Sequence, residues 1–131
     1  AHFEKKMQQL ILSKGKKMIG WDEILNDGLS PDVAVMSWRG MNPGIAAARQ
    51  KHPVVMSPWG QAYLDLCQGD PLVEPHTYGM LRFKTCYDFN PCPDSVDAKY
   101  ILGGQGNLWT EAVPNERQAE YMTWPRTLAF A

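Results

Sequence analysis

Short apolar runs alternate with amphipathic and turn-forming segments along the whole chain. Residues 2–14 carry one apolar stripe at helical spacing, which predicts an amphipathic helix. Apolar runs predict strands over 18–21, 33–38, 53–57 and 100–104, the last continuing through Leu108-Trp109. Helices are expected over 44–50 and 115–131, the second kinked or restarted at Pro125, with a short helix or turn over 61–66.

This order of elements predicts an α/β fold with a parallel sheet. The run over 33–38 is apolar nearly throughout, which is typical of a strand buried on both faces. Helical segments between the strands fit the crossover connections that parallel strands require. Residues 67–97 are rich in Pro and Gly, and a loop of that length usually serves a function or packs over another segment.

The composition is that of a globular domain with many tryptophans. Of 131 residues, 44% are hydrophobic and 21% are charged, which argues against intrinsic disorder. No apolar run is long enough to span a membrane, and the N-terminal residues do not resemble a signal peptide. The net charge of -1 disfavours a nucleic-acid-binding surface. Five Trp and ten Pro are many for this length, and the positions of the tryptophans guide the functional prediction.

Cysteine and histidine show no pattern of a metal or redox site. Three cysteines without Cys-x-x-Cys spacing or paired histidines exclude a disulfide-dense scaffold, and we expect no metal and no cofactor. One disulfide is possible, but free or partly buried thiols are favoured at Cys67, Cys86 and Cys92. His52 and His76 are interpreted as surface or packing residues.

Aromatic and acidic residues follow each predicted strand, where ligands bind in parallel α/β folds. They are Trp21-Asp22-Glu23, Ser37-Trp38-Arg39, Trp59 with Tyr63 and Asp65, and Trp109 with Glu111. Indole rings stack on the C–H faces of a pyranose, and carboxylates accept hydrogen bonds from its hydroxyls. A single Trp at a strand end is more often a packing residue, but three beside polar residues favour a sugar site. No phosphate-binding or dinucleotide-binding glycine motif is present.

The adjacent carboxylates of Asp22 and Glu23 allow two interpretations. They can open a helix, where negative charge favours the helix dipole. They can also be a catalytic acid and its partner. We favour the structural interpretation.

Five segments resemble, in order, the second half of the catalytic domain of glycoside hydrolase family 20, the β-N-acetylhexosaminidases. These are GWDEIL (20–25), SWRG (37–40), SPW…YLD (57–65), ILGGQGNLWTE (101–111) and EYMTWPRTLA (120–129). The resemblance implies a (β/α)8 barrel, which needs roughly 250 residues. Residues 1–131 are therefore expected to be a partial catalytic barrel domain, truncated on its N-terminal side, with about strands five to eight.

The resemblance also implies a reaction. That family removes terminal β-linked N-acetylglucosamine or N-acetylgalactosamine with retention, and the 2-acetamido oxygen of the substrate attacks the anomeric carbon. The Asp that orients this group and the acid/base Glu belong to a His-x-Gly-Gly-Asp-Glu motif after the fourth strand. The motif is absent here, so Asp22 and Glu23 are not the catalytic pair, and we expect the chain alone to be inactive.

Six residues receive roles from the resemblance. Tyr63 would be catalytic, because its hydroxyl would donate to the acetamide oxygen and place it for attack. The substrate-binding residues would be three tryptophans that wall the pocket and two acids that bind outer hydroxyls: Trp21, Trp38, Trp109, Asp65 and Glu111. The family often has a further Trp in the loop after the YLD element. This chain has Tyr78 and Tyr87 there but no Trp until Trp109, so the sequence does not establish whether either tyrosine fills that place or how the leaving-group side of the pocket is shaped.

Two other functions stay open. The chain could be a non-catalytic carbohydrate-binding module with the same tryptophans, or a half-barrel that self-associates through open sheet edges. The expected partner is a carbohydrate, with neither nucleic acid nor a membrane span involved. The resemblance favours a periplasmic, secreted or lysosome-like location.

Overall fold

The computed structural model describes residues 2–26, 28–74 and 77–131. The chain forms two compact units, and the chain passes twice from the first to the second. Unit 1 comprises Ala1–Met56 and Pro91–Gly104. Unit 2 comprises Ser57–Asn90 and Gln105–Ala131.

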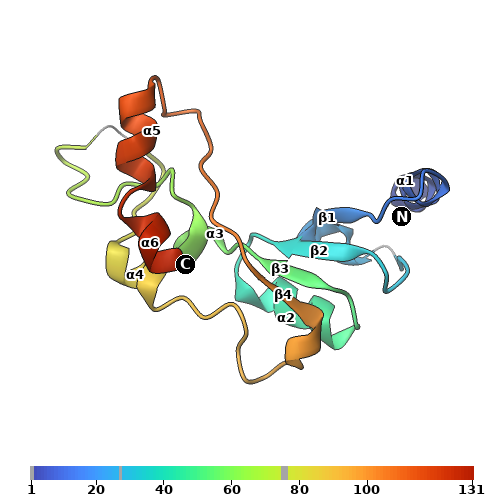
Figure 1. The fold of residues 1–131 in the computed structure, drawn as a ribbon. Coiled ribbons are helices and arrows are strands. Elements are labelled where there is room, and N and C mark those ends of the chain that lie inside the picture. The colour runs from blue at the N-terminus through green and yellow to red at the C-terminus, as the bar shows by residue number, and fades with distance from the viewer. Residues whose placement is uncertain (1, 27, 75–76) are drawn as a thin grey trace. The chain divides into compact units, whose positions relative to one another are not determined.

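Unit 1 contains a four-stranded parallel sheet in the order β1-β2-β3-β4 (Figure 1). The strands are β1 (Ile19–Trp21), β2 (Ala34–Ser37), β3 (Val54–Met56) and β4 (Ile101–Gly104). All four lie within the runs that the sequence predicts as strands. Strands that neighbour one another in sequence order form the wall of a (β/α)8 barrel, whereas a doubly wound sheet reverses its order.

Helix α2 (Met41–Arg49) packs directly on β2 and β3 (Figure 1). A Cβ atom at Gly44 would lie 2.9 Å from the Ser37 Cβ and 2.5 Å from the Met56 sulfur, so only glycine allows this approach. The core between the helix and the sheet consists of fully buried apolar side chains: Val35, Ala47, Val54 and Met56. The sequence predicts that the strand over 33–38 is buried on both faces. Only one face is fully buried, because Ala34 and Met36 on the other face are half-buried.

The remaining elements of unit 1 are helical. Helix α1 (His2–Ser13) forms where the sequence predicts it, although none of its residues is buried. Two 3-10 helices, η1 (Asp22–Asn26) and η2 (Ala98–Tyr100), follow β1 and precede β4. The predicted continuation of the fourth strand through Trp109 is wrong, because β4 ends at Gly104. Gly103 lies inside β4 with a φ of +132°, which glycine tolerates, and the pairing of β4 with β3 is irregular between Val54 and Val55.

Unit 2 contains four short helices: α3 (Trp59–Ala62), α4 (Phe83–Tyr87), α5 (Glu116–Thr123) and α6 (Arg126–Phe130). Helix α4 packs against α6, and the rings of Phe89 and Phe130 lie 5.2 Å apart. Helix α4 lies within the stretch 67–97, which was predicted to be irregular. The sequence does not predict this helix, because five helical residues are too few to show a helical period. The helix predicted over 115–131 divides before Pro125, as expected, at a cis Trp124–Pro125 bond.

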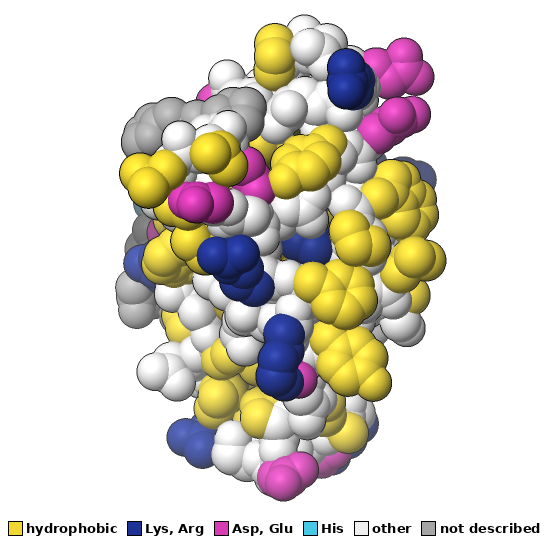
Figure 2. Space-filling view, turned by 90° about the vertical axis from the view of Figure 1, so that its left-hand side faces the viewer, with side chains coloured by type: hydrophobic (Ala, Val, Ile, Leu, Met, Phe, Trp, Pro, Cys, Tyr) yellow, Lys and Arg dark blue, Asp and Glu magenta, His cyan; other side chains and the backbone are white. Residues whose placement is uncertain are grey.

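Many hydrophobic side chains stay exposed. Figure 2 shows them in yellow, gathered mainly along the right-hand side of that view. The most exposed large ones of unit 2 are Leu72, Val73, Tyr87 and Leu128. Exposed apolar patches often mark interaction surfaces, and self-association stays a prediction.

The cysteines and His52 occupy packing positions. Cys67 and Cys86 are buried, Cys92 is half-buried, and all three are thiols, as the sequence favours. The His52 ring is buried, and its Nδ1 atom lies 2.9 Å from the Val33 carbonyl oxygen, which confirms its packing role. His76 lies outside the described residues. Within the described ranges, no helix is long and apolar enough to cross a membrane.

Candidate functional site

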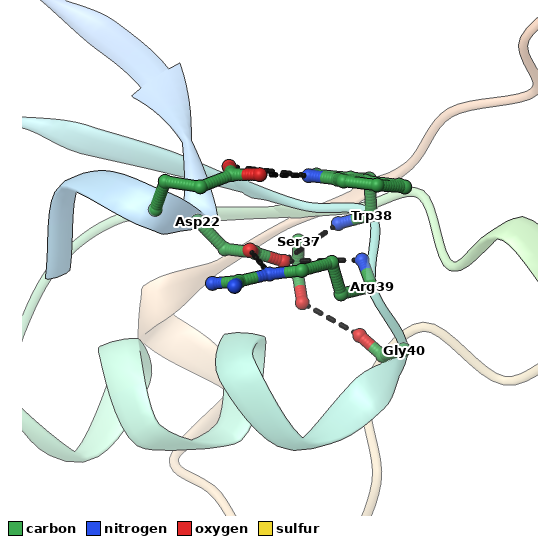
Figure 3. Close-up of polar contacts among 6 residues, drawn as sticks. Asp22, Ser37, Trp38, Arg39 and Gly40 are labelled. Atoms are coloured by element: carbon green, nitrogen blue, oxygen red, sulfur yellow. Dashed lines mark hydrogen bonds and ion pairs between the residues drawn. The ribbon is translucent and has the colours of Figure 1, made fainter.

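Asp22 fixes the chain at the carboxyl end of β2 (Figure 3). Its fully buried carboxylate accepts hydrogen bonds from the backbone N–H groups of Trp38 at 3.0 Å and Arg39 at 3.1 Å. The Arg39 guanidinium also donates to it through Nε. Asp22 opens η1, as expected of a helix-opening charge, but its main interactions are with the residues that follow β2.

Glu23 orients the indole ring of Trp38. The Trp38 Nε1–H donates to both Glu23 oxygens, at 2.9 Å and 3.1 Å. Ser37 donates to the Gly40 carbonyl at 2.7 Å, which turns the chain toward α2. Trp21 ends β1 with 38% of its surface exposed. The Asp22–Glu23 pair therefore holds a tryptophan-bearing turn, in agreement with its structural interpretation.

Replacing Asp22 with alanine should lower the free energy of unfolding by about 3 kcal/mol, because two partly buried N–H groups and a partly exposed guanidinium lose their acceptor. Asp22→Asn keeps one acceptor oxygen and should cost about half as much. Denaturant unfolding of the protein measures both effects. The matched control is Glu23→Gln, which changes the exposed neighbouring carboxylate and should cost less than about 1 kcal/mol. Equal losses for Asp22→Ala and Glu23→Gln would contradict this role.

In unit 2, the segment after α3 carries two of the predicted site residues, Tyr63 and Asp65. Two backbone hydrogen bonds join it to the segment that leads toward Trp109. Leu64 N–H donates to Asn107 O at 2.6 Å, and Asn107 N–H donates to Ala62 O at 2.8 Å. This single parallel bridge brings the Tyr63 and Trp109 rings to 6.3 Å between centroids.

Buried polar side chains hold the same two segments together. The Asn107 amide donates to the Ser57 hydroxyl at 2.7 Å, and Ser57 donates to the Gln105 carbonyl at 2.9 Å. Gln105 in turn donates to the Asn107 side-chain oxygen at 2.8 Å. Tyr63 itself is 5% exposed, so both its backbone and its ring are fixed.

A pocket of about 250 Å³ opens beside this segment. Its lining residues are Asp65, Thr77, Tyr78, Trp109, Glu111 and Ala112. Three of the sequence-predicted site residues therefore line one pocket, and Tyr63 lies against one of its walls. Trp21 and Trp38 belong to unit 1.

Asp65 is the buried acid of the pocket. It is 2% exposed, and its Oδ2 accepts a hydrogen bond from the Tyr78 hydroxyl. Its Oδ1 is buried and has no hydrogen-bond partner among the described residues. Burial and the bond to Asp65 raise the pKa of Tyr78 well above 10.0, so this phenol stays protonated. A buried acceptor without a partner is costly, so Oδ1 is the atom of this pocket with an unmet need for a hydrogen-bond donor.

The two tyrosines of the long loop lie in different surroundings. Tyr78 lines the pocket, whereas Tyr87 ends α4 with 70% of its surface exposed. The only feature of the sequence that pointed to Tyr78 as a pocket residue was its position after the YLD segment.

Arg126 supports the pocket from behind and was missed at the sequence level. Its fully buried guanidinium donates to four backbone carbonyls, those of Leu64, Leu66, Leu81 and Met122. Two of these carbonyls flank Asp65. Burial lowers the pKa of the Arg126 guanidinium, and the carbonyl dipoles stabilise its charge.

The pocket has the character of a polyol site. Two carboxylates and an indole face it, and Trp109 is 40% exposed. In the part of the chain that the structure describes, no three His, Cys, Asp or Glu side chains are grouped to hold a metal ion.

Comparisons with known proteins agree with this chemistry. The model of the glycosyl hydrolase family 20 catalytic domain matches residues 1–131. A beta-hexosaminidase of Porphyromonas gingivalis is 44% identical over 136 residues, covering 100% of this chain and 18% of that protein. A beta-hexosaminidase of Vibrio furnissii is 33% identical over 135 residues, covering 98% of this chain and 21% of that protein.

A solved structure shares the fold as well. The family 20 exo-beta-N-acetylglucosaminidase of Vibrio harveyi, in complex with N-acetylglucosamine, has a TM-score of 0.83 and 28% sequence identity. The match covers 98% of this chain and 21% of that one. The chain thus spans about a fifth of the length of the relatives it matches.

Proposed function

This chain belongs to glycosyl hydrolase family 20, and from that premise we propose that it forms part of the catalytic barrel of a β-N-acetylhexosaminidase. Its four parallel strands, in sequential order, are typical of a stretch of barrel wall, and the order of the family-like segments leads us to assign them to strands five to eight. The relatives' lengths support a longer enzyme in which this chain contributes sugar-binding residues.

The observation that carries the proposal is the unpaired, buried Oδ1 of Asp65 in a pocket that also presents Trp109 and Glu111. Trp109 offers an aromatic face for the apolar side of the sugar ring. Asp65 and Glu111 accept hydrogen bonds from its hydroxyls. A blocked hydroxyl would leave Asp65 buried without a partner, so the site selects a terminal residue. Trp21 and Trp38 are proposed to contact sugar as well.

The proposed reaction is retaining and substrate-assisted. The acetamide carbonyl oxygen of the bound sugar attacks the anomeric carbon, and the glycosidic bond breaks as an acid supplied outside residues 1–131 protonates the leaving oxygen. Water then attacks the anomeric carbon of the oxazolinium intermediate from the face that the leaving group occupied, the bond to the acetamide oxygen breaks, and the conjugate base takes the proton of the water. Tyr63 donates its hydroxyl to the acetamide oxygen and orients it for attack.

A pair of aryl glycosides tests this proposal. The full-length enzyme should hydrolyse an aryl β-N-acetylglucosaminide at least about 1,000-fold faster than the matching β-glucoside, which has no acetamide oxygen to attack. The first product detected by proton NMR should be the β-anomer. Comparable rates on the two glycosides would contradict substrate assistance.

Residues 1–131 alone serve as the matched control. The chain lacks the acid/base pair and should show no turnover, and Glu23→Gln in the full-length enzyme should keep its hydrolase activity. Clear turnover by the chain alone, lost on Glu23→Gln, would assign catalysis to Asp22 and Glu23 instead. Sugar binding without hydrolysis by the full-length protein would favour a carbohydrate-binding module.

A further inference from the structure

Tyr78 and Asp65 form a pair that the proposed mechanism does not use. The Tyr78 hydroxyl donates to Asp65 Oδ2, while Oδ1 of the same carboxylate is buried without a partner among the described residues. Both residues line the pocket. A carboxylate has about four acceptor positions on two oxygens. The phenol takes one acceptor position on Oδ2, and both positions of Oδ1 stay available for a ligand.

The residues on both sides of Tyr78 are anchored. The Thr77 hydroxyl accepts from Cys67 N–H at 3.1 Å and donates to the Gly79 carbonyl at 2.9 Å. Cys67 N–H also donates to Gly79 O at 3.0 Å, and a single parallel bridge joins Cys67 to Met80. These bonds hold the backbone around Tyr78 beside the segment that carries Asp65. The phenol is thus positioned before any ligand arrives.

We propose that Tyr78 is a specificity-determining residue of the sugar pocket: its hydroxyl fixes the Asp65 carboxylate so that only Oδ1 meets the substrate. This inference rests on the proposed function and adds a named selectivity residue to it. With Oδ2 occupied, Asp65 accepts from one sugar hydroxyl in one orientation. A sugar that lacks that hydroxyl, or carries it on the opposite face of the ring, leaves Oδ1 unpaired and is rejected.

The ring of Tyr78 has a separate role from its hydroxyl. The ring is 62% exposed and forms part of the pocket wall, as any aromatic side chain could. Only the hydroxyl can hold Oδ2. Because burial and Asp65 raise its pKa, the hydroxyl stays a donor through the neutral range and up to at least its usual pKa of 10.0.

The experiment separates hydroxyl from ring in the full-length enzyme. The variants are Tyr78→Phe, which removes the hydroxyl, and Tyr78→Leu, which removes the ring as well. Tyr87→Phe, an exposed tyrosine of α4 outside the pocket, is the matched control. The substrates are an aryl β-N-acetylglucosaminide, its galacto epimer, and analogues that each lack one ring hydroxyl.

In the unchanged enzyme, one deoxy analogue should lose about 100-fold or more in kcat/KM. Tyr78→Phe should lower kcat/KM for the parent substrate about tenfold and shrink that discrimination to about tenfold, because Asp65 can then rotate. In an Asp65→Asn background, Tyr78→Phe should have less than about a twofold further effect, since the two residues act as a pair. Tyr87→Phe should change neither quantity.

Two results would overturn the inference, and they differ from failure of the proposed function. Tyr78→Phe with unchanged kcat/KM and unchanged discrimination would show that Tyr78 serves only as an aromatic wall. Additive effects of Tyr78→Phe and Asp65→Asn would show that the two residues act independently. An unchanged enzyme without any turnover of the parent substrate would refute the proposed function, and this inference with it.

Discussion

Replacing Arg126 with methionine is expected to lower the free energy of unfolding by about 4 kcal/mol, among the larger effects that a single substitution produces. The guanidinium makes five hydrogen bonds to four backbone carbonyls, and the side chain is fully buried. Methionine fills similar volume but donates nothing, so all four carbonyls lose this donor. A buried carbonyl without a partner costs about 1–3 kcal/mol, and relief from burying a charge offsets part of the sum.

Denaturant unfolding of the full-length enzyme measures this loss. Arg126→Lys keeps the positive charge but has a single donor group, so it should recover only part of the stability. Arg117→Met, on the exposed side of α5, is the matched control and should change stability by less than about 0.5 kcal/mol. An Arg126→Met loss no larger than that of Arg117→Met would contradict the supporting role of Arg126.

Replacing Tyr63 with phenylalanine is expected to lower kcat about 100-fold in the full-length enzyme, as loss of one preorganised donor to a reacting oxygen typically does. Under the proposed mechanism, the hydroxyl serves the acetamide oxygen most strongly when that oxygen carries developing charge in the transition state. KM should therefore change by less than about threefold. The ring should stay in place, because it is buried beside Trp109 and its backbone is bridged to Asn107.

Steady-state kinetics on an aryl β-N-acetylglucosaminide give both constants. Tyr87→Phe controls for the loss of a tyrosine hydroxyl elsewhere and should leave both unchanged. Equal losses in kcat and in substrate affinity would mean that Tyr63 only binds the sugar and does not assist the attack.

Much of the sheet in unit 1 could be predicted from the sequence, because each strand is a local apolar run that ends at turn residues. The runs at 18–21, 33–38 and 53–57 contain β1, β2 and β3. The hydrophobic pattern did not predict where β4 ends or that α4 forms. Leu108 and Trp109 look like a continued strand, but β4 ends at Gly104, and irregular backbone that includes Asn107 follows it. Helix α4 is too short to show a period.

The sequence predicted most of the residue types of the candidate site, but it did not predict how all of them are held in place. Tyr63, Asp65, Trp109 and Glu111 were expected from the residue types that follow the strands, and the structure places three of them around one pocket with Tyr63 beside it. Arg126 could not be found this way, since an Arg after Pro near a helix end gives no sign of burial. Its partners are backbone carbonyls distant in sequence, which no local pattern encodes.

Asp22 illustrates the same limit. From the sequence, the two adjacent acids are interpreted as a charge pair that opens a helix, which says nothing of burial, and Glu23 is exposed. Asp22 is instead fully buried, because the amides that follow β2 lie within reach of its carboxylate. Only the register between β1 and β2 brings these groups together.

The most direct test of the central claim is a crystal structure of the full-length enzyme with N-acetylglucosamine bound. We expect one sugar ring against Trp109, a ring hydroxyl that donates to Asp65 Oδ1 while Tyr78 keeps its bond to Oδ2, and an acetamide oxygen that accepts from Tyr63. A sugar bound at the active centre without contact to Asp65, Trp109 or Tyr63 would contradict it.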